Sequence, residues 1–198
     1  SRDYFVPGVV VNIIAYVTLM LTAMSIVRER EIGTMEQLIV TPIRPIELII
    51  GKLLPYAAIG ILDVGLVTAA ALIVFHTPFR GNAIILLAST LLFLLATLGA
   101  GLFISTFSHN QQQALFGSFL FLLPALLLSG FAFPIRNMPA PVQFLTYLNP
   151  LRYFMEIVRG VFLKGSGIGY LWPQMAALAV IGVAALALST ARFQKRLD

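Results

Sequence analysis

Long apolar runs, separated by short polar segments, constrain this chain more than any other feature of its sequence. A membrane-spanning helix needs about 20 apolar residues, because each residue adds about 1.5 Å along the axis and the hydrocarbon layer is about 30 Å thick. The runs therefore predict an all-α, polytopic membrane protein that forms one domain over residues 1–198. The expected transmembrane helices lie at about residues 7–27, 46–75, 83–107, 114–133 and 171–189.

The composition agrees with a surface that faces lipid. Hydrophobic residues make up 59% of the chain and charged residues only 11%, with a mean hydropathy of +0.94, whereas a soluble domain carries about a quarter charged residues. The net charge is +5, but the Lys and Arg residues stand at the edges of the apolar runs, where lipid head groups favour them. We therefore expect the lipid bilayer as a partner and no nucleic acid.

The sequence lacks the motifs of an enzyme. It contains no cysteine, and His76 and His109 lie far apart, so we expect no metal site and no catalytic residue. Gly51 and Lys52 lack both the upstream glycine and the following Ser or Thr of a phosphate-binding loop. We expect no cofactor and no hydrolysis of ATP by this chain itself, which leaves transport, conduction and scaffolding as possible functions.

A dense island of charge, residues 29–42, separates the first two apolar runs. Gly33 is expected to interrupt the preceding helix, and Thr34 followed by Gln37 matches a capping box for a new turn. Pro42 would end this short helix. Such an element, held in water between two spans, either docks on a soluble partner or merely connects the spans.

Asp63 stands out inside the second apolar run. A carboxyl group at membrane depth is costly, and such residues usually face a bundle interior or a watery cavity. Asp63 is therefore a candidate for a substrate path, a proton site or a structural hydrogen bond between helices.

The segment 134–169 is too polar to cross the membrane and carries a second helix signal. Asn149 can cap a helix whose first position is Pro150. The polar residues that follow form one stripe on a mostly apolar helix, which is typical of an interfacial or re-entrant element. They serve either as an ordinary helix ion pair or as a gate at the mouth of a pathway. The residues concerned are Arg152, Tyr153, Glu156 and Arg159.

Two motifs, in this order, resemble the membrane subunit of bacterial type-2 ABC transporters. The first is Glu29-Arg30-Glu31-x-Gly33-Thr34-x-Glu36-x-Leu38-x-x-Thr41-Pro42, and the second is Asn149-Pro150-Leu151-Arg152-Tyr153-x-x-Glu156-x-x-Arg159-Gly160. The resemblance is to the multidrug-type permeases with a large extracytoplasmic insert. Because such permeases have six spans, it implies a C-terminal fragment that lacks the first span and the external domain.

The resemblance also implies roles for these residues. Segment 29–42 would be the cytoplasmic coupling helix, received by a groove on a separate ATP-binding subunit, and segment 134–169 an extracytoplasmic re-entrant hairpin. Two permease subunits, identical or different, would pair in the bacterial plasma membrane and export drugs or other lipophilic small molecules. The coupling residues would be Glu29, Arg30, Glu31, Gly33, Thr34, Glu36 and Pro42, and the re-entrant residues Asn149, Pro150, Arg152, Tyr153, Glu156 and Arg159.

Two other functions remain open at this stage. One is an ATP-independent secondary transporter or channel that uses Asp63 as an ion site, and the other is a membrane scaffold that moves nothing. The distribution of Lys and Arg favours segment 29–42 on the inner side only mildly.

Overall fold

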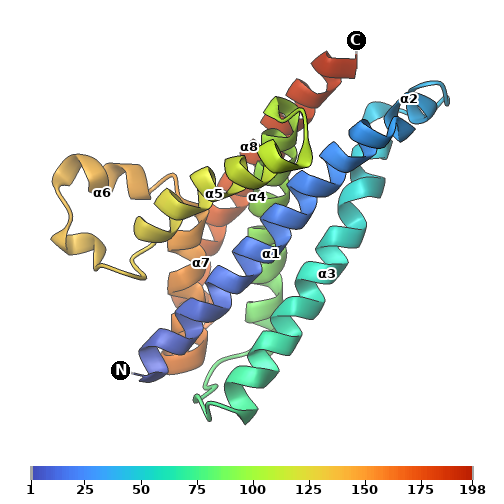
Figure 1. Ribbon diagram of the computed structural model, residues 1–198. Helices are drawn as coiled ribbons and strands as arrows, with labels where there is room; N and C mark the ends of the chain where they lie inside the picture. The colour runs from blue at the N-terminus through green and yellow to red at the C-terminus, as the bar shows by residue number, and fades with distance from the viewer. Residues whose placement is uncertain (1, 198) are drawn as a thin grey trace.

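The computed structural model describes residues 2–197, including the side chains of residues 3–195. Over these residues every regular element is a helix, so the predicted all-α class is confirmed (Figure 1). Four helices are long and apolar enough to cross a membrane, which confirms a polytopic membrane protein. They are α1 (Arg2–Ile32), α3 (Pro45–Ile73), α4 (Ala83–Phe107) and α8 (Ile168–Leu197).

The remaining predicted span, residues 114–133, forms a shorter helix. Helix α5 (Gln111–Leu127) has 17 residues, fewer than the roughly 20 that a span requires. It ends although apolar residues continue, because the chain turns at Gly130, whose φ of 83° is the left-handed conformation that commonly terminates helices. The described residues therefore contain four helices of spanning length and a shorter fifth, where five spans were predicted.

The charged island is divided between two helices. Helix α1 continues through the first charges to Ile32, Gly33 turns the chain with a φ of 82°, and α2 (Thr34–Ile39) is a single short helix. The predicted capping box is wrong, because the Thr34 hydroxyl donates instead to the Glu29 carbonyl at 3.0 Å. The predicted coupling helix over residues 29–42 thus shrinks to six residues.

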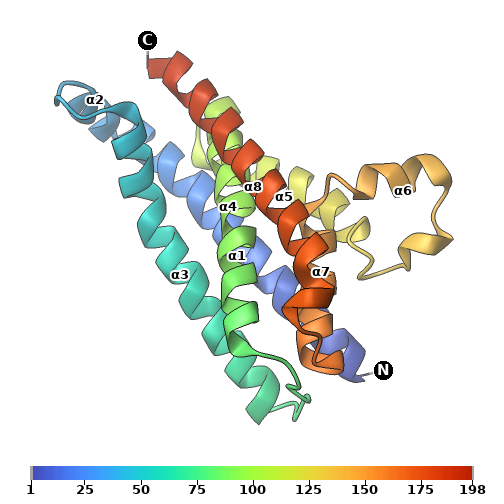
Figure 2. The same ribbon diagram turned by 180° about the vertical axis from the view of Figure 1, so that it is seen from behind.

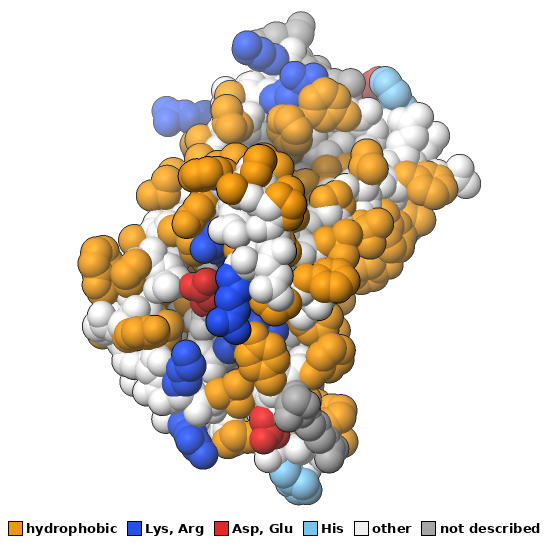
Figure 3. All heavy atoms as spheres, turned by 90° about the vertical axis from the view of Figure 1, so that its left-hand side faces the viewer, with side chains coloured by type: hydrophobic (Ala, Val, Ile, Leu, Met, Phe, Trp, Pro, Cys, Tyr) orange, Lys and Arg blue, Asp and Glu red, His pale blue; other side chains and the backbone are white. Residues whose placement is uncertain are grey.

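Segment 134–169 contains two helical turns and two short helices. These are η1 (Ile135–Asn137), α6 (Ala140–Thr146), α7 (Pro150–Arg159) and the π-helical turn η2 (Gly160–Lys164). Helix α6 stands away from the bundle in both ribbon views, whereas α7 lies along it (Figures 1 and 2). The side from which α6 projects carries scattered basic side chains among hydrophobic ones (Figure 3).

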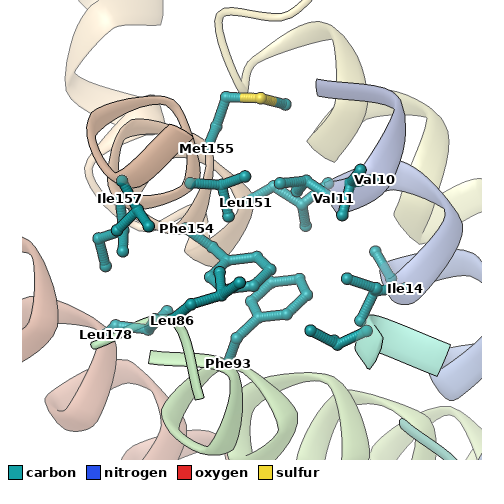
Figure 4. Close-up of a cluster of buried hydrophobic side chains, with 14 of the residues drawn as sticks. Val10, Val11, Ile14, Leu86, Phe93, Leu151, Phe154, Met155, Ile157 and Leu178 are labelled. Atoms are coloured by element: carbon teal, nitrogen blue, oxygen red, sulfur yellow. The ribbon is translucent and has the colours of Figure 1, made fainter. Parts of the chain in front are cut away.

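The apolar side of α7 packs into the largest buried cluster of the bundle. Phe154 of α7 stacks on Phe93 of α4 with ring centroids 4.3 Å apart, and both side chains are fully buried (Figure 4). Ile14 of α1 and Leu178 of α8 belong to the same cluster. The apolar side of α7 is therefore part of the core, held among three of the long helices.

Small residues let the long helices approach each other closely. A side chain at Gly99 of α4 would place its Cβ 2.8 Å from the Leu186 nitrogen of α8, and the Ser189 hydroxyl donates to the Gly99 carbonyl at 2.6 Å. Close backbone contact of this kind is a major source of helix association in lipid, where the hydrophobic effect between helices is absent. Gly65 of α3, in contrast, has no neighbouring atom within 4 Å of such a Cβ.

These two glycines give a matched test of the packing. We expect Gly99→Ala to lower the stability by about 1–3 kcal/mol through overpacking, since the added methyl group meets the backbone of α8. Gly65→Ala should instead leave stability unchanged or raise it by about 0.5–1 kcal/mol through helix propensity. The measurement is the midpoint temperature of thermal unfolding of the full-length protein in detergent, with circular dichroism as the signal. Equal effects of the two substitutions would contradict the packing described here.

Candidate coupling surface and its connections

Helix α2 packs one side against the bundle, and the rest of its surface is exposed. Met35 is 5% exposed and packs in a cluster with Ile49 of α3. Three apolar side chains in and just after α2 are exposed, and Val40 is 86% exposed. We call them the α2 patch: Ile39, Val40 and Ile43.

Polar groups border the α2 patch. Glu36 lies on the exposed side of α2, and Pro42 lies in the exposed turn that follows it. Arg44 precedes α3 as its N-cap residue, and its backbone amide donates to the Glu47 carboxylate in the first turn at 3.3 Å. The patch is therefore a small apolar surface with charges of both signs at its edge.

Glu29 joins the end of α1 to the beginning of α3. Its carboxylate forms a salt bridge with Lys52, whose side chain is only 11% exposed. The same ammonium group donates to the Met35 sulfur at 3.3 Å. Lys52 thus connects α1, α2 and α3.

Arg30 and Glu31 contact the turn between α4 and α5. The Arg30 guanidinium donates to the carbonyls of Ser105 and Ser108, at 3.2 and 3.0 Å. Glu31 accepts from the Gln111 backbone amide at 3.0 Å and from its side-chain amide at 2.7 Å. These partners could not be recognised from the sequence, because they lie 75 to 80 positions further along the chain. The predicted coupling residues therefore separate into an outward group and a group bound within the bundle.

The second motif ties α5 to α7. The Asn149 side-chain carbonyl accepts from the Leu151 amide at 3.1 Å, which confirms the predicted cap, and its amide donates to the Ala125 carbonyl at 2.6 Å. Pro150 occupies the first helical turn, as predicted, and is buried. One side chain thus satisfies a free amide of α7 and a carbonyl of α5.

Arg152 contacts residues at the end of α6 more closely than it contacts Glu156. Its guanidinium donates to the Thr146 hydroxyl and lies 4.2 Å from the centre of the Tyr147 ring. The distance from Arg152 Nε to Glu156 Oε1 is 3.9 Å, too long for a hydrogen bond. The Tyr153 hydroxyl also reaches this end of α6, donating to the Tyr147 carbonyl at 2.7 Å.

Arg159 and Glu156 connect α7 to other helices. Arg159 donates to the Tyr4 hydroxyl of α1 at 2.9 Å and lies 3.9 Å from the centre of that ring. Burial lowers the pKa of the Arg159 guanidinium, while Tyr4 and Glu156 act in the opposite direction. Glu156 accepts from Gln174 of α8 at 3.1 Å. Arg159 and Glu156 therefore connect α7 to α1 and to α8.

Asp63 lies half-buried on α3. Among the described residues its Oδ2 atom has no hydrogen-bond partner. Over the same part of the chain, no group of three or more His, Cys, Asp or Glu side chains is placed to hold a metal ion.

This combination of long apolar helices, close small-residue contacts and a small exposed element between two of the long helices is that of a multi-pass membrane protein. The profile of the family described as ABC-2 type transporter matches residues 1–163. The chain belongs to this family, and it is a type-2 ABC transporter permease, as the two motifs had indicated.

Similar proteins include three from Escherichia coli strain K12. The chain is 38% identical to "Probable multidrug ABC transporter permease YbhS" over 202 residues, 100% of this chain and 53% of the relative. It is 34% identical to "Probable multidrug ABC transporter permease YbhR" over 189 residues, 93% and 51% of the two chains. It is 30% identical to "Inner membrane transport permease YhhJ" over 187 residues, 94% and 50%. The chain thus spans about half the length of these curated relatives.

Asn149 provides a test of the connection between α5 and α7. Asn149→Ala removes the cap and leaves the buried Ala125 carbonyl unpaired, so we expect a loss of about 1–3 kcal/mol. Asn149→Ser keeps a capping oxygen but is too short to reach Ala125, and it should fall between Ala and the native residue. The thermal midpoint in detergent measures both. As a control, Asn82→Ser, at the exposed cap of α4, should have little effect.

Proposed function

We propose that this chain is the membrane-spanning permease part of an ATP-driven exporter whose energy comes from a separate ATP-binding subunit. The observation that carries the proposal is the α2 patch, an exposed apolar surface that joins two helices of spanning length. The sequence contains no phosphate-binding loop of its own. A partner that binds nucleotide would therefore supply the energy.

The chemistry of the α2 patch suits such a partner. Its three aliphatic side chains are exposed, and burial of apolar surface stabilises a complex by about 25 cal/mol per Å². Glu36 at its edge would add polar contacts that favour one orientation. Because Met35 and Lys52 attach α2 to α3, a displacement of the docked element would be passed into the bundle.

The wider assembly follows from the same proposal. The patch would face the cytoplasm of a bacterium, with the bundle in the plasma (inner) membrane. A second permease subunit, identical or different, would complete the pathway. Helix α6 supports this pairing, since it stands off the bundle and exposes Phe144 and Leu145, 72% and 57%. The substrates would be drugs or other lipophilic small molecules, as the names of two relatives suggest.

A second candidate function rests on Asp63. The unpartnered Oδ2 atom of this residue supports contact with an ion, a proton or a substrate, as in an ATP-independent secondary transporter or channel. The exporter is preferred because a secondary transporter gives no role to the α2 patch.

Docking of the ATP-binding subunit on the α2 patch can be tested by replacing one of its apolar side chains with a charged one. In the full-length protein, we expect Val40→Asp to reduce co-purification with the ATP-binding subunit by about tenfold, equivalent to about 1.4 kcal/mol, because a carboxylate would be forced into an apolar contact. Val40→Leu keeps the surface apolar and should retain binding. Affinity purification from membranes measures both variants. Equal recovery of the subunit with Val40→Asp and with the native protein would remove the docking proposal.

Asp63→Asn separates the two candidate functions. In proteoliposomes that contain the permease and the ATP-binding subunit, we expect this variant to retain ATP-dependent transport of a rhodamine dye. The amide keeps the shape of the side chain but cannot ionise. Dye transport driven by a pH gradient without ATP, and abolished by Asp63→Asn, would favour the secondary transporter instead.

A further inference from the structure

Three consecutive charged residues at the end of α1 contact three different helices. Glu29 pairs with Lys52 of α3, Arg30 donates to carbonyls at the end of α4, and Glu31 accepts from the first residue of α5. All three immediately precede the Gly33 turn that leads into α2. The end of α1 is therefore the point at which α2 is connected to the rest of the bundle.

The charges at the turn between α4 and α5 have the signs that the helix ends favour. The C-terminal carbonyls of a helix carry partial negative charge and its N-terminal amides partial positive charge. Arg30 lies at the end of α4, with Ser108 as its C-cap, and Glu31 lies at the start of α5. Because the donors or acceptors are ionised, these hydrogen bonds are stronger than neutral ones.

The contact continues along α5 with apolar packing. Ala114 of α5 is fully buried against Ala23 and Val27 of α1. The turn itself is satisfied by local bonds, since Asn110 accepts from the Gln113 amide at 2.8 Å. The first turn of α5 is therefore held both to α1 and to the turn that precedes it.

We propose that Arg30 and Glu31 form a clamp that passes displacement of α2 directly to α5, in parallel with the route through Lys52 to α3. This inference rests on the proposed function. In this arrangement Arg30 and Glu31 are positioning residues. The α2 patch and Glu36 make the contact with the ATP-binding subunit. From α5 the displacement reaches α7 through the bond between Asn149 and the Ala125 carbonyl.

The test uses the full-length permease with its ATP-binding subunit in proteoliposomes, with ATP hydrolysis and rhodamine transport measured separately. Glu31→Ala removes both bonds to Gln111. We expect it to bind the subunit and hydrolyse ATP at nearly the native rate while transport falls by about tenfold, because two charge-assisted bonds are lost. Glu36→Ala, on the exposed side of α2, is the matched control and should instead weaken binding of the subunit.

A charge swap distinguishes a clamp from general instability. In the double variant Glu31→Gln with Gln111→Glu, the amide and the carboxylate exchange places, so the side chains can bond again. Transport should recover relative to Glu31→Ala, with a thermal midpoint close to the native one. Failure of the swap to restore transport would overturn the clamp.

Other outcomes separate the clamp from the proposed function. Native transport by Glu31→Ala would overturn the clamp and leave the exporter standing. Loss of subunit binding by Glu31→Ala would also overturn it, since Glu31 would then act at the docking surface. Absence of ATP-dependent transport in the native complex would remove the exporter proposal, and the clamp with it.

Discussion

The packing of α1 against α3, α4, α5 and α7 is the contact on which the rest of the structure depends. In lipid this packing relies on close van der Waals contact and on polar groups that find partners within the protein. Val11, Ile14 and Leu19 are fully buried, and the Thr18 and Thr22 hydroxyls donate to carbonyls one turn earlier at 2.6 Å. Because α2 follows α1 directly, the exposed element is attached to a helix that packs against α3, α4, α5 and α7.

Much of the fold could be predicted from local sequence. Apolar length located the long helices, and Gly33, Pro45 and Asn149 mark the boundaries where backbone chemistry places them. The end of α5 could not be predicted, because apolar residues continue to Phe133 and only the conformation of Gly130 stops the helix. The burial of α7 depends on Phe93, which is distant in sequence, and a polar stripe on one helix carries no information about that partner.

The sequence predicted the candidate site as one segment, residues 29–42, and did not predict how its residues divide between the bundle and the exposed surface. Seven residues were grouped as one coupling element, whereas three of them, Glu29, Arg30 and Glu31, have partners in α3, at the end of α4 and in α5. Charge density shows that a segment lies in water, but it does not show which charges face inward. The apolar residues of the α2 patch are Ile39, Val40 and Ile43. They could be recognised only from their exposure in the structure.

The brevity of α5 has a consequence for the surrounding bilayer. A helix of 17 residues reaches only about 25 Å at 1.5 Å per residue, less than the roughly 30 Å of hydrocarbon. A helix of this length does not reach across the hydrocarbon by itself, and at lipid depth the free amides and carbonyls beyond its end require partners in water or protein. A bilayer accommodates a short apolar helix by thinning locally, so the 17 residues of α5 favour a thinner hydrocarbon layer beside this helix than beside the longer α1, α3, α4 and α8.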